Sequence, residues 1–224
     1  MGLFYALAIV VLWLGHLLFC LQSGSVDPAS PMLYVHMLVQ AWLYTGLFIT
    51  GHDAMHGTVS RNKALNDGIG FLVILLFAGM NYRQLLAKHK LHHEFPGEAR
   101  DPDYARQSQN FWLWWFSFMR QYITLWQLIF MAIFYNVLLL FFSQKNLLFF
   151  WVIPAFMATL QLFYFGTYRP HRLPHLPDME PHKSRTQRKN HIWAMLTCYF
   201  FGYHYEHHAS PRTPWWRLWK MKNA

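Results

Sequence analysis

Eight of the fourteen histidines in this 224-residue chain fall into three short clusters. The clusters span His52–His56, His89–His93 and His204–His208, and the last two share the pattern His-x-x-His-His. Side chains three or four residues apart lie on one face of a helix, with Cβ atoms about 5–6 Å apart. Neutral imidazole binds iron, copper, zinc and nickel. Because eight ligands exceed what one ion can use, the clusters predict a centre for two metal ions, with the candidate ligands His52, His56, His89, His92, His93, His204, His207 and His208.

Other side chains near the clusters could complete such a centre. A ligating histidine usually donates its second ring proton to a carboxylate or a carbonyl. The candidate acceptors, each of which could instead cap a helix or form a loop ion pair, are Asp53, Asp101, Asp103 and Glu206. His171 directly follows an apolar segment and is a candidate ninth ligand, whereas Pro170 and Pro174 break the helical spacing that would bring His175 to the same site. We interpret the remaining histidines as ordinary polar residues: His16, His36, His182 and His191.

The composition indicates an integral membrane protein. The chain is 54% hydrophobic, and its 13% of charged residues is far below the share of about 25% in soluble domains. Four apolar segments without Asp, Glu, Lys or Arg approach the roughly 20 residues that cross a bilayer core. We expect them to form two hairpins from the spans Gly2–Leu21, Pro31–Thr50, Gln121–Phe142 and Leu147–Tyr168. For the first span, a cleaved signal peptide is the alternative, but no basic region precedes it and no small-residue cleavage site follows.

The segments between and after the hairpins are expected to lie at the membrane surface. Gly68–Met80 is too short for a typical crossing, and a full crossing would place His89–His93 opposite the first cluster, so a re-entrant or in-plane helix is predicted. Phe111–Met119 is dense in Trp and Phe, as is typical of the headgroup region, and Pro214–Lys220 resembles an interfacial anchor. The predicted fold is one all-α integral membrane domain over residues 1–224, with four transmembrane helices, interfacial or re-entrant helices and a cytoplasmic histidine-rich cap.

The net charge of +9 is distributed in a way that argues against a nucleic-acid partner. Eighteen of the nineteen Lys and Arg residues lie on the segments that carry the histidine clusters, and the two connections within the hairpins contain only Lys145. Basic residues near span ends mark the cytoplasmic side of a membrane. We therefore expect all three clusters on the cytoplasmic side of a bacterial inner membrane, next to anionic lipid. The two cysteines, Cys20 and Cys198, are far apart in apolar segments and indicate neither a disulfide nor a Cys-based metal site.

The clusters resemble the three histidine boxes of the membrane fatty-acid hydroxylase and desaturase superfamily. The first stands in Gly51–Gly57, the second is followed by Phe95-Pro96-Gly97 and Asp101–Tyr104, and the third stands in Tyr203–His208. Within that superfamily, the element Phe-Gly-Thr-Tyr-Arg-Pro-His at residues 165–171 and the Pro-Trp-Trp tail closely resemble bacterial β-carotene ketolases. The resemblance runs from about Gly51 to Leu218 and thus covers most of the chain.

This resemblance implies a di-iron oxygenase that converts the C4 methylene of a β-ionone ring to a ketone, by two hydroxylations and loss of water. The implied iron ligands are the eight clustered histidines, with His171 as the ninth. Two departures from acyl-CoA desaturases favour oxygenase chemistry over desaturation. His52 and His56 are four residues apart, whereas the desaturase box spaces its histidines by five, and Thr167 stands where those desaturases carry Asn.

The reaction implies partners that the chain itself does not contain. No Gly-x-Gly-x-x-Gly motif and no cysteine run is present, so electrons would come from a separate protein, such as a ferredoxin with its reductase. The carotenoid would enter from the bilayer, and O2 is the co-substrate. The alternatives within the enzyme class are a carotenoid hydroxylase and a fatty-acyl hydroxylase or desaturase. A metal transporter, or a haem protein that uses His16 and His36, is the non-enzyme alternative.

Overall fold

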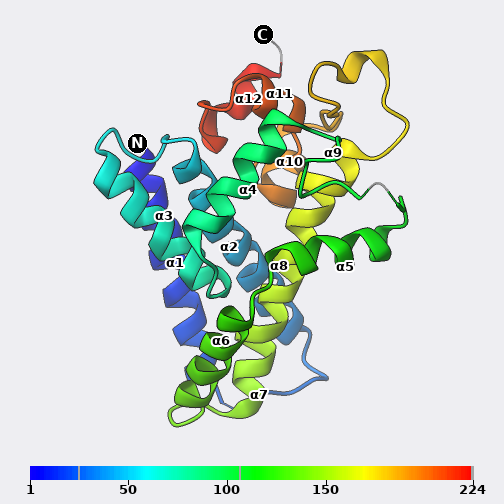
Figure 1. The fold of residues 1–224 in the computed structure, drawn as a ribbon. Helices are drawn as coiled ribbons and strands as arrows, with labels where there is room; N and C mark the ends of the chain where they lie inside the picture. Colours follow the sequence, from blue (N-terminus) through cyan, green and yellow to red (C-terminus); the bar gives the residue numbers. More distant parts are fainter. Residues whose placement is uncertain (25, 106, 223–224) are drawn as a thin grey trace.

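The computed structural model describes residues 1–24, 26–105 and 107–222 and consists of helices joined by loops (Figure 1). In this described part of the chain, the only β pairing is a single bridge between Thr186 and Tyr203. The prediction of an all-α protein is therefore confirmed. The predicted domain limits include residues 25, 106, 223 and 224, which lie outside the described residues.

Within the described residues, three helices are long and apolar enough to cross a membrane, and two bent helix pairs could add one broken span each. Helix α1 spans Gly2–Gln22 and helix α2 spans Pro31–Met55, close to the first two predicted spans. The third is a 28-residue rod, Gln144–His171, which extends the predicted span Leu147–Tyr168 at both ends. Helix α2 is central, because it packs against α1, α8 (Ile153–Phe163) and α3 (Lys63–Ala78). It also runs five residues beyond the predicted end at Thr50, so that His52 lies in its last turn.

The rod contains two turns of π-helix, and each has an identifiable cause. They span Leu148–Val152 and Tyr164–Tyr168, and each ends two residues before a proline, Pro154 or Pro170. A proline inside a helix lacks an N–H donor, and its ring collides with the carbonyl four residues earlier. In both cases that carbonyl lies within the π-helical turn, where the wider winding accommodates the ring. The rod then continues through α9, Arg169–His171, which carries the candidate ninth ligand.

The predicted span Gln121–Phe142 is not a single helix, and this part of the prediction is corrected. The structure has α5, Phe111–Tyr122, followed by α6, Leu125–Leu138, and the two axes are bent by 87°. Thr124 starts a new helix by accepting a hydrogen bond from Gln127 N–H in a capping box. With 14 residues, α6 is about 21 Å long, shorter than the roughly 30 Å hydrocarbon core of a bilayer. The sequence pattern showed a continuous apolar run but not the cap that divides it.

A second bend lies between α3 and α4, Tyr82–Glu94, whose axes differ by 98°. Gly79 ends α3 with a left-handed backbone, φ +64°, and Asn81 caps α4 through hydrogen bonds from Arg83 N–H and Gln84 N–H. This bend fits the predicted re-entrant or in-plane helix, because it brings the second cluster back to the first. Figure 1 shows α4 at the same end of the molecule as the short helices α10, His191–Cys198, α11, His204–Ala209, and α12, Leu218–Met221.

The C-terminal segment packs more deeply than a membrane anchor would. Trp215 is buried, contacts Tyr5 and Tyr199 edge-on, and donates its backbone N–H to Asp53 Oδ2 at 3.2 Å. Trp219, at 39% exposed, stands at the surface together with Arg217 and Lys220, as interfacial residues would. The segment therefore joins the first histidine cluster to α1 and to Tyr199, in addition to any contact with lipid.

Candidate metal centre

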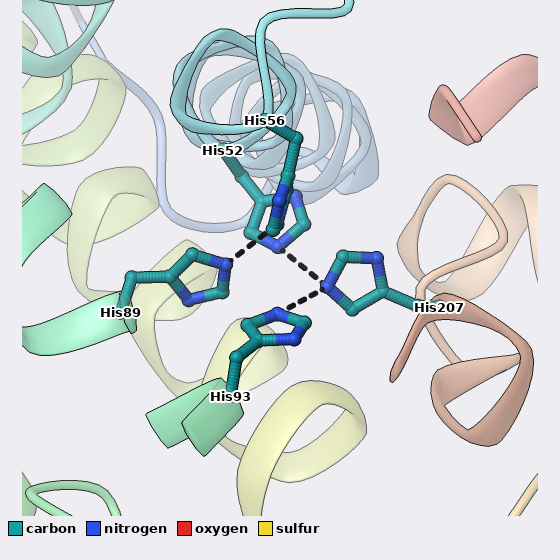
Figure 2. A group of neighbouring side chains, drawn as sticks. All are labelled: His52, His56, His89, His93 and His207. Carbon is teal, nitrogen blue, oxygen red and sulfur yellow. Dashed lines mark hydrogen bonds between the residues drawn. The ribbon is translucent and has the colours of Figure 1, made fainter. Parts of the chain in front are cut away.

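The three clusters, which are far apart in sequence, meet at one end of the helix bundle and form two groups. The ligand atoms within each group lie within 4.8 Å of one another. The five-histidine group takes residues from α2 and its C-cap, from α4 and from α11, and consists of His52, His56, His89, His93 and His207 (Figure 2). The four-histidine group takes residues from α4, α9 and α11 and consists of His92, His171, His204 and His208. The nine residues predicted as ligands are thus all present, and the structure adds no tenth histidine to either group.

In the five-histidine group the ring nitrogens face one another rather than hydrogen-bond acceptors. Nε2 of His207 lies 3.1 Å from Nε2 of His52 and 2.9 Å from Nε2 of His93. Dashed lines mark both contacts in Figure 2. Nε2 of His56 lies 2.8 Å from Nε2 of His89. An imidazole nitrogen carries either one proton or one lone pair. Nε2 of His207 therefore cannot form good hydrogen bonds to both neighbours, but all five nitrogens can share a metal ion.

The four-histidine group repeats this convergence. Nε2 of His208 lies 3.2 Å from Nε2 of both His92 and His204. Nε2 of His171 is buried in the same group without a hydrogen-bond partner. Nitrogen ligands about 2.1 Å from a shared ion lie roughly 3.0–3.4 Å apart. The observed separations fit that geometry, so both groups are suited to hold one ion each.

Two rings of the four-histidine group are oriented by oxygen acceptors. Nδ1 of His92 donates to Asp101 Oδ1 at 3.0 Å, and Nδ1 of His171 donates to the carbonyl of Lys183 at 3.0 Å. Asp101 is itself fixed by the backbone N–H groups of Gly97 and Asp103, each at 2.8 Å. Each acceptor holds its ring in the tautomer whose Nε2 lone pair points into the group.

The other three predicted acceptors have different contacts. Asp53 receives the N–H of Trp215, and its Oδ1 lies 3.9 Å from His52 Nδ1, beyond hydrogen-bond distance. Asp103 receives the hydroxyl of Tyr122, and its Oδ2 lies 3.7 Å from His92 Nδ1. Oε2 of Glu206 is buried without a partner. Among these four carboxylates, only Asp101 is hydrogen-bonded to an imidazole.

Burial favours the neutral form of the clustered imidazoles, which is the form that binds a metal, except at His92, where the carboxylates of Asp101 and Asp103 outweigh burial and raise the pKa to about 9. Burial lowers the pKa of His56 to about 4. Burial, together with the neighbouring imidazoles, also holds the pKa values of His204, His207 and His208 well below their ordinary value. Each of these four histidines therefore offers a nitrogen lone pair to a metal at pH 7 without first losing a proton.

The remaining histidines lie outside both groups. Nε2 of His175 donates to the carbonyl of His171 at 2.9 Å. Nδ1 of His191 lies 2.8 Å from the hydroxyl of Tyr203, and the ring of His182 lies beside Tyr205 and His208 with its centroid 5.8 Å from that of His208. His16 and His36 contact each other directly, with nitrogens 3.2 Å apart, which leaves no room for a haem plane between them.

A mostly apolar pocket opens onto both groups. Its inner end includes His52 and His89 from the five-histidine group and His92 and His204 from the four-histidine group. Its outer end lies at the two helix bends, next to Ala78, Met80 and Ile123. The walls between are lined mainly by apolar side chains, with a few hydroxyl groups, the carboxylate of Asp103 and the amide of Gln127; they include Phe48, Phe77, Leu85, Phe118, Tyr122, Leu162, Thr167 and Phe201.

The π-helical turn before His171 shapes one wall of this pocket. It contains Gly166 and Thr167, which both line the pocket. A Cβ on Gly166 would lie 2.3 Å from the ring of Phe201, so only glycine permits this approach. Phe201 in turn packs edge-on against His52 and His204, with centroids 4.8 and 5.0 Å away. Phe201 and Tyr122 were not predicted as site residues, since aromatic residues are too common in this chain for these two to stand out.

Comparison with known proteins agrees with the geometry. The fatty acid desaturase family model matches residues 29–135 and 118–224. The chain is 39% identical to a zeaxanthin 4-ketolase of Chlamydomonas reinhardtii over 99% of its own length and 51% of the relative's. It is 41% identical to a β-carotene 4-ketolase of Haematococcus lacustris over 85% of its length and 62% of the relative's.

A bacterial relative is covered more fully. The β-carotene ketolase of Paracoccus sp. strain PC1 is 38% identical over 94% of this chain and 88% of the relative. The chain thus spans about half to three-fifths of the two algal relatives but most of the bacterial one. No solved structure matches the chain.

Proposed function

We propose, from the premise that this chain belongs to the fatty acid desaturase family, that it is a carotenoid ketolase. The substrate would be a carotenoid with a β-ionone ring, and the product would carry a ketone at ring carbon C4. The observation that carries the proposal is the convergence of nine histidines at the inner end of an apolar pocket. The similarity to relatives named as β-carotene and zeaxanthin ketolases selects the substrate class.

The two histidine groups would hold two iron ions, one in each. When bound, the iron pair would supply O2-dependent oxidation, with electrons from an external donor. Nitrogen ligands of this kind also suit copper, zinc and nickel, so the choice of iron rests on the family. His92 and His171 are oriented for this task by Asp101 and by the Lys183 carbonyl.

The pocket residues would position the ring and exclude water. Phe48, Phe77 and Phe201 provide apolar and aromatic surface for a polyene end group. The pocket lies between the two helix bends, and its outer residue Ile123 is exposed, so a substrate dissolved in the bilayer can enter sideways. The pocket must hold the same ring carbon through two hydroxylations, each of which consumes one O2 and two electrons. The resulting geminal diol loses water to give the ketone.

The orientation and the electron donor are further parts of the proposal. All nine candidate ligands lie at the end of the bundle to which most basic residues map, which supports a cytoplasmic site under the positive-inside rule. A basic face also favours an acidic redox partner such as a ferredoxin. Anionic lipids of an inner membrane would contact the same surface.

Expression of the chain in a bacterium that produces β-carotene tests the function. The expected products are the mono- and diketone of β-carotene, identified by chromatography with mass spectrometry. Cells that express His207→Ala provide the matched negative control. Accumulation of hydroxylated carotenoid alone would instead indicate a carotenoid hydroxylase. Unchanged carotenoid together with altered fatty acids would indicate an acyl-lipid enzyme.

A further inference from the structure

A third set of metal-ligating side chains lies between α1 and α2, outside the site described above. His16 and Cys20 are one turn apart on α1, and His36 faces them from α2. Cys20 Sγ lies 3.7 Å from His16 Nε2, which lies 3.2 Å from His36 Nδ1. Cys20 is buried, and the two rings are partly exposed. Three potential ligand atoms thus converge on one point from two helices, which differs from the expectation from sequence that Cys20 belongs to no metal site and that His16 and His36 are ordinary polar residues.

The His16 ring is held in the tautomer that a ligand needs. Its Nδ1 donates to Oε1 of Gln40 at 2.5 Å. Gln40 is fully buried, and its Nε2 donates to the carbonyl of Trp13, so its oxygen must face the histidine. The lone pair of His16 Nε2 therefore points toward Cys20 and His36. His92 and Asp101 show the same arrangement in the four-histidine group.

The ligand atoms are spaced for a three-coordinate ion. Nitrogen about 2.0 Å and sulfur about 2.3 Å from one ion in a plane lie roughly 3.7 Å apart. The sulfur–nitrogen distance of 3.7 Å matches this value, and the nitrogen–nitrogen distance of 3.2 Å is close to the roughly 3.5 Å expected for two such nitrogens. The polar neighbour Gln40 is already engaged with His16 and Trp13 and supplies no fourth ligand.

These features select the metal. Zinc sites in proteins usually have four ligands, whereas a thiolate with two imidazoles and no carboxylate is a soft, low-coordinate set that suits monovalent copper. We propose that His16, Cys20 and His36 form a binding site for Cu(I), oriented by Gln40. The site is separate from the proposed iron centre, because His36 precedes His52 by sixteen residues, about 24 Å along α2. This inference does not depend on the proposed ketolase activity.

The site is tested by Cu(I) binding to the purified full chain, measured anaerobically in competition with a chromophoric Cu(I) chelator. The wild type is expected to bind one equivalent of copper that Cys20→Ser and His36→Gln each lose. Cys198→Ser is the matched control, because Cys198 is equally buried but belongs to none of the metal-ligating groups in the described part of the chain. If Cys20→Ser and His36→Gln bind as much Cu(I) as the wild type, the proposal is overturned.

X-ray absorption at the copper edge separates this site from adventitious binding to the other histidines. A short copper–sulfur distance is expected in the wild type and in Cys198→Ser, and it should disappear in Cys20→Ser. A spectrum with nitrogen neighbours alone in the wild type would contradict the proposal. The iron content should be the same in the wild type and in His36→Gln. Equal iron content would show that the variant is folded.

Discussion

The two histidine groups differ in how far the protein prepares them for a metal. The four-histidine group is wholly buried, and the rings of His92 and His171 are locked by Asp101 and by the carbonyl of Lys183. The five-histidine group has three partly exposed members, and no oxygen within the described residues accepts a ring proton from it. One group thus has four ligands, two of which are fixed by acceptors, and the other has five ligands without such acceptors in the described part of the chain. We infer that the four-histidine group binds its ion more tightly.

Removing one ligand from each group should give the largest effect. His92→Ala and His207→Ala take away nitrogens at the centre of the two groups, where each faces at least one other imidazole. Both variants should lower iron content and abolish ketone formation. Iron analysis and carotenoid chromatography on the same preparation measure this. A variant that kept full iron and wild-type turnover would remove that residue from the ligand set.

Weakening the support of the four-histidine group should have a smaller effect. Asp101→Asn keeps the shape but removes the charge that holds the Nδ1 proton of His92. Loss of such a partner typically lowers metal affinity or activity by about 10–100-fold. Asp53→Asn is the matched comparison, since Asp53 contacts the backbone of Trp215 rather than an imidazole. Equal loss of iron in both variants would show that the hydrogen bond between Asp101 and the His92 ring does not determine the affinity for iron.

Chelation should separate the groups kinetically. The rings of His56, His89 and His93 are partly exposed, whereas His92 and His171 are buried. Iron should therefore leave in two phases, with the faster phase from the five-histidine group. The faster phase should be missing in His207→Ala and the slower one in His92→Ala. A single phase in the wild type would contradict the proposed difference.

The sequence predicted the chemistry better than the path of the chain. Spacing of three and four residues identified the clustered histidines, because helical geometry translates directly into ligand geometry. The apolar run Gln121–Phe142 concealed a break at Thr124, since hydropathy does not register a single helix cap. The carbonyl of Lys183 could not be predicted at all, because every residue has one and only the fold selects it. All four candidate carboxylates stand near a histidine cluster in the sequence. Only the structure shows that Asp101 is the one hydrogen-bonded to an imidazole.

The smallest effects are expected at histidines outside both groups. His182→Ala and His191→Ala remove partly exposed rings that lie outside both sets of ligand atoms. Substitutions away from the core and from functional contacts usually change stability by less than about 0.5 kcal/mol. Iron content and product yield should stay within about twofold of the wild type. An inactive His182→Ala with normal expression would extend the four-histidine group beyond His208 to His182.

The central claim is that distant parts of the chain bring two irons together. It is tested most directly by counting iron in purified, catalytically active protein and recording its Mössbauer spectrum. We predict two irons per chain in two distinct nitrogen environments, with one signal lost in His207→Ala. Active protein that contains no iron would contradict the account.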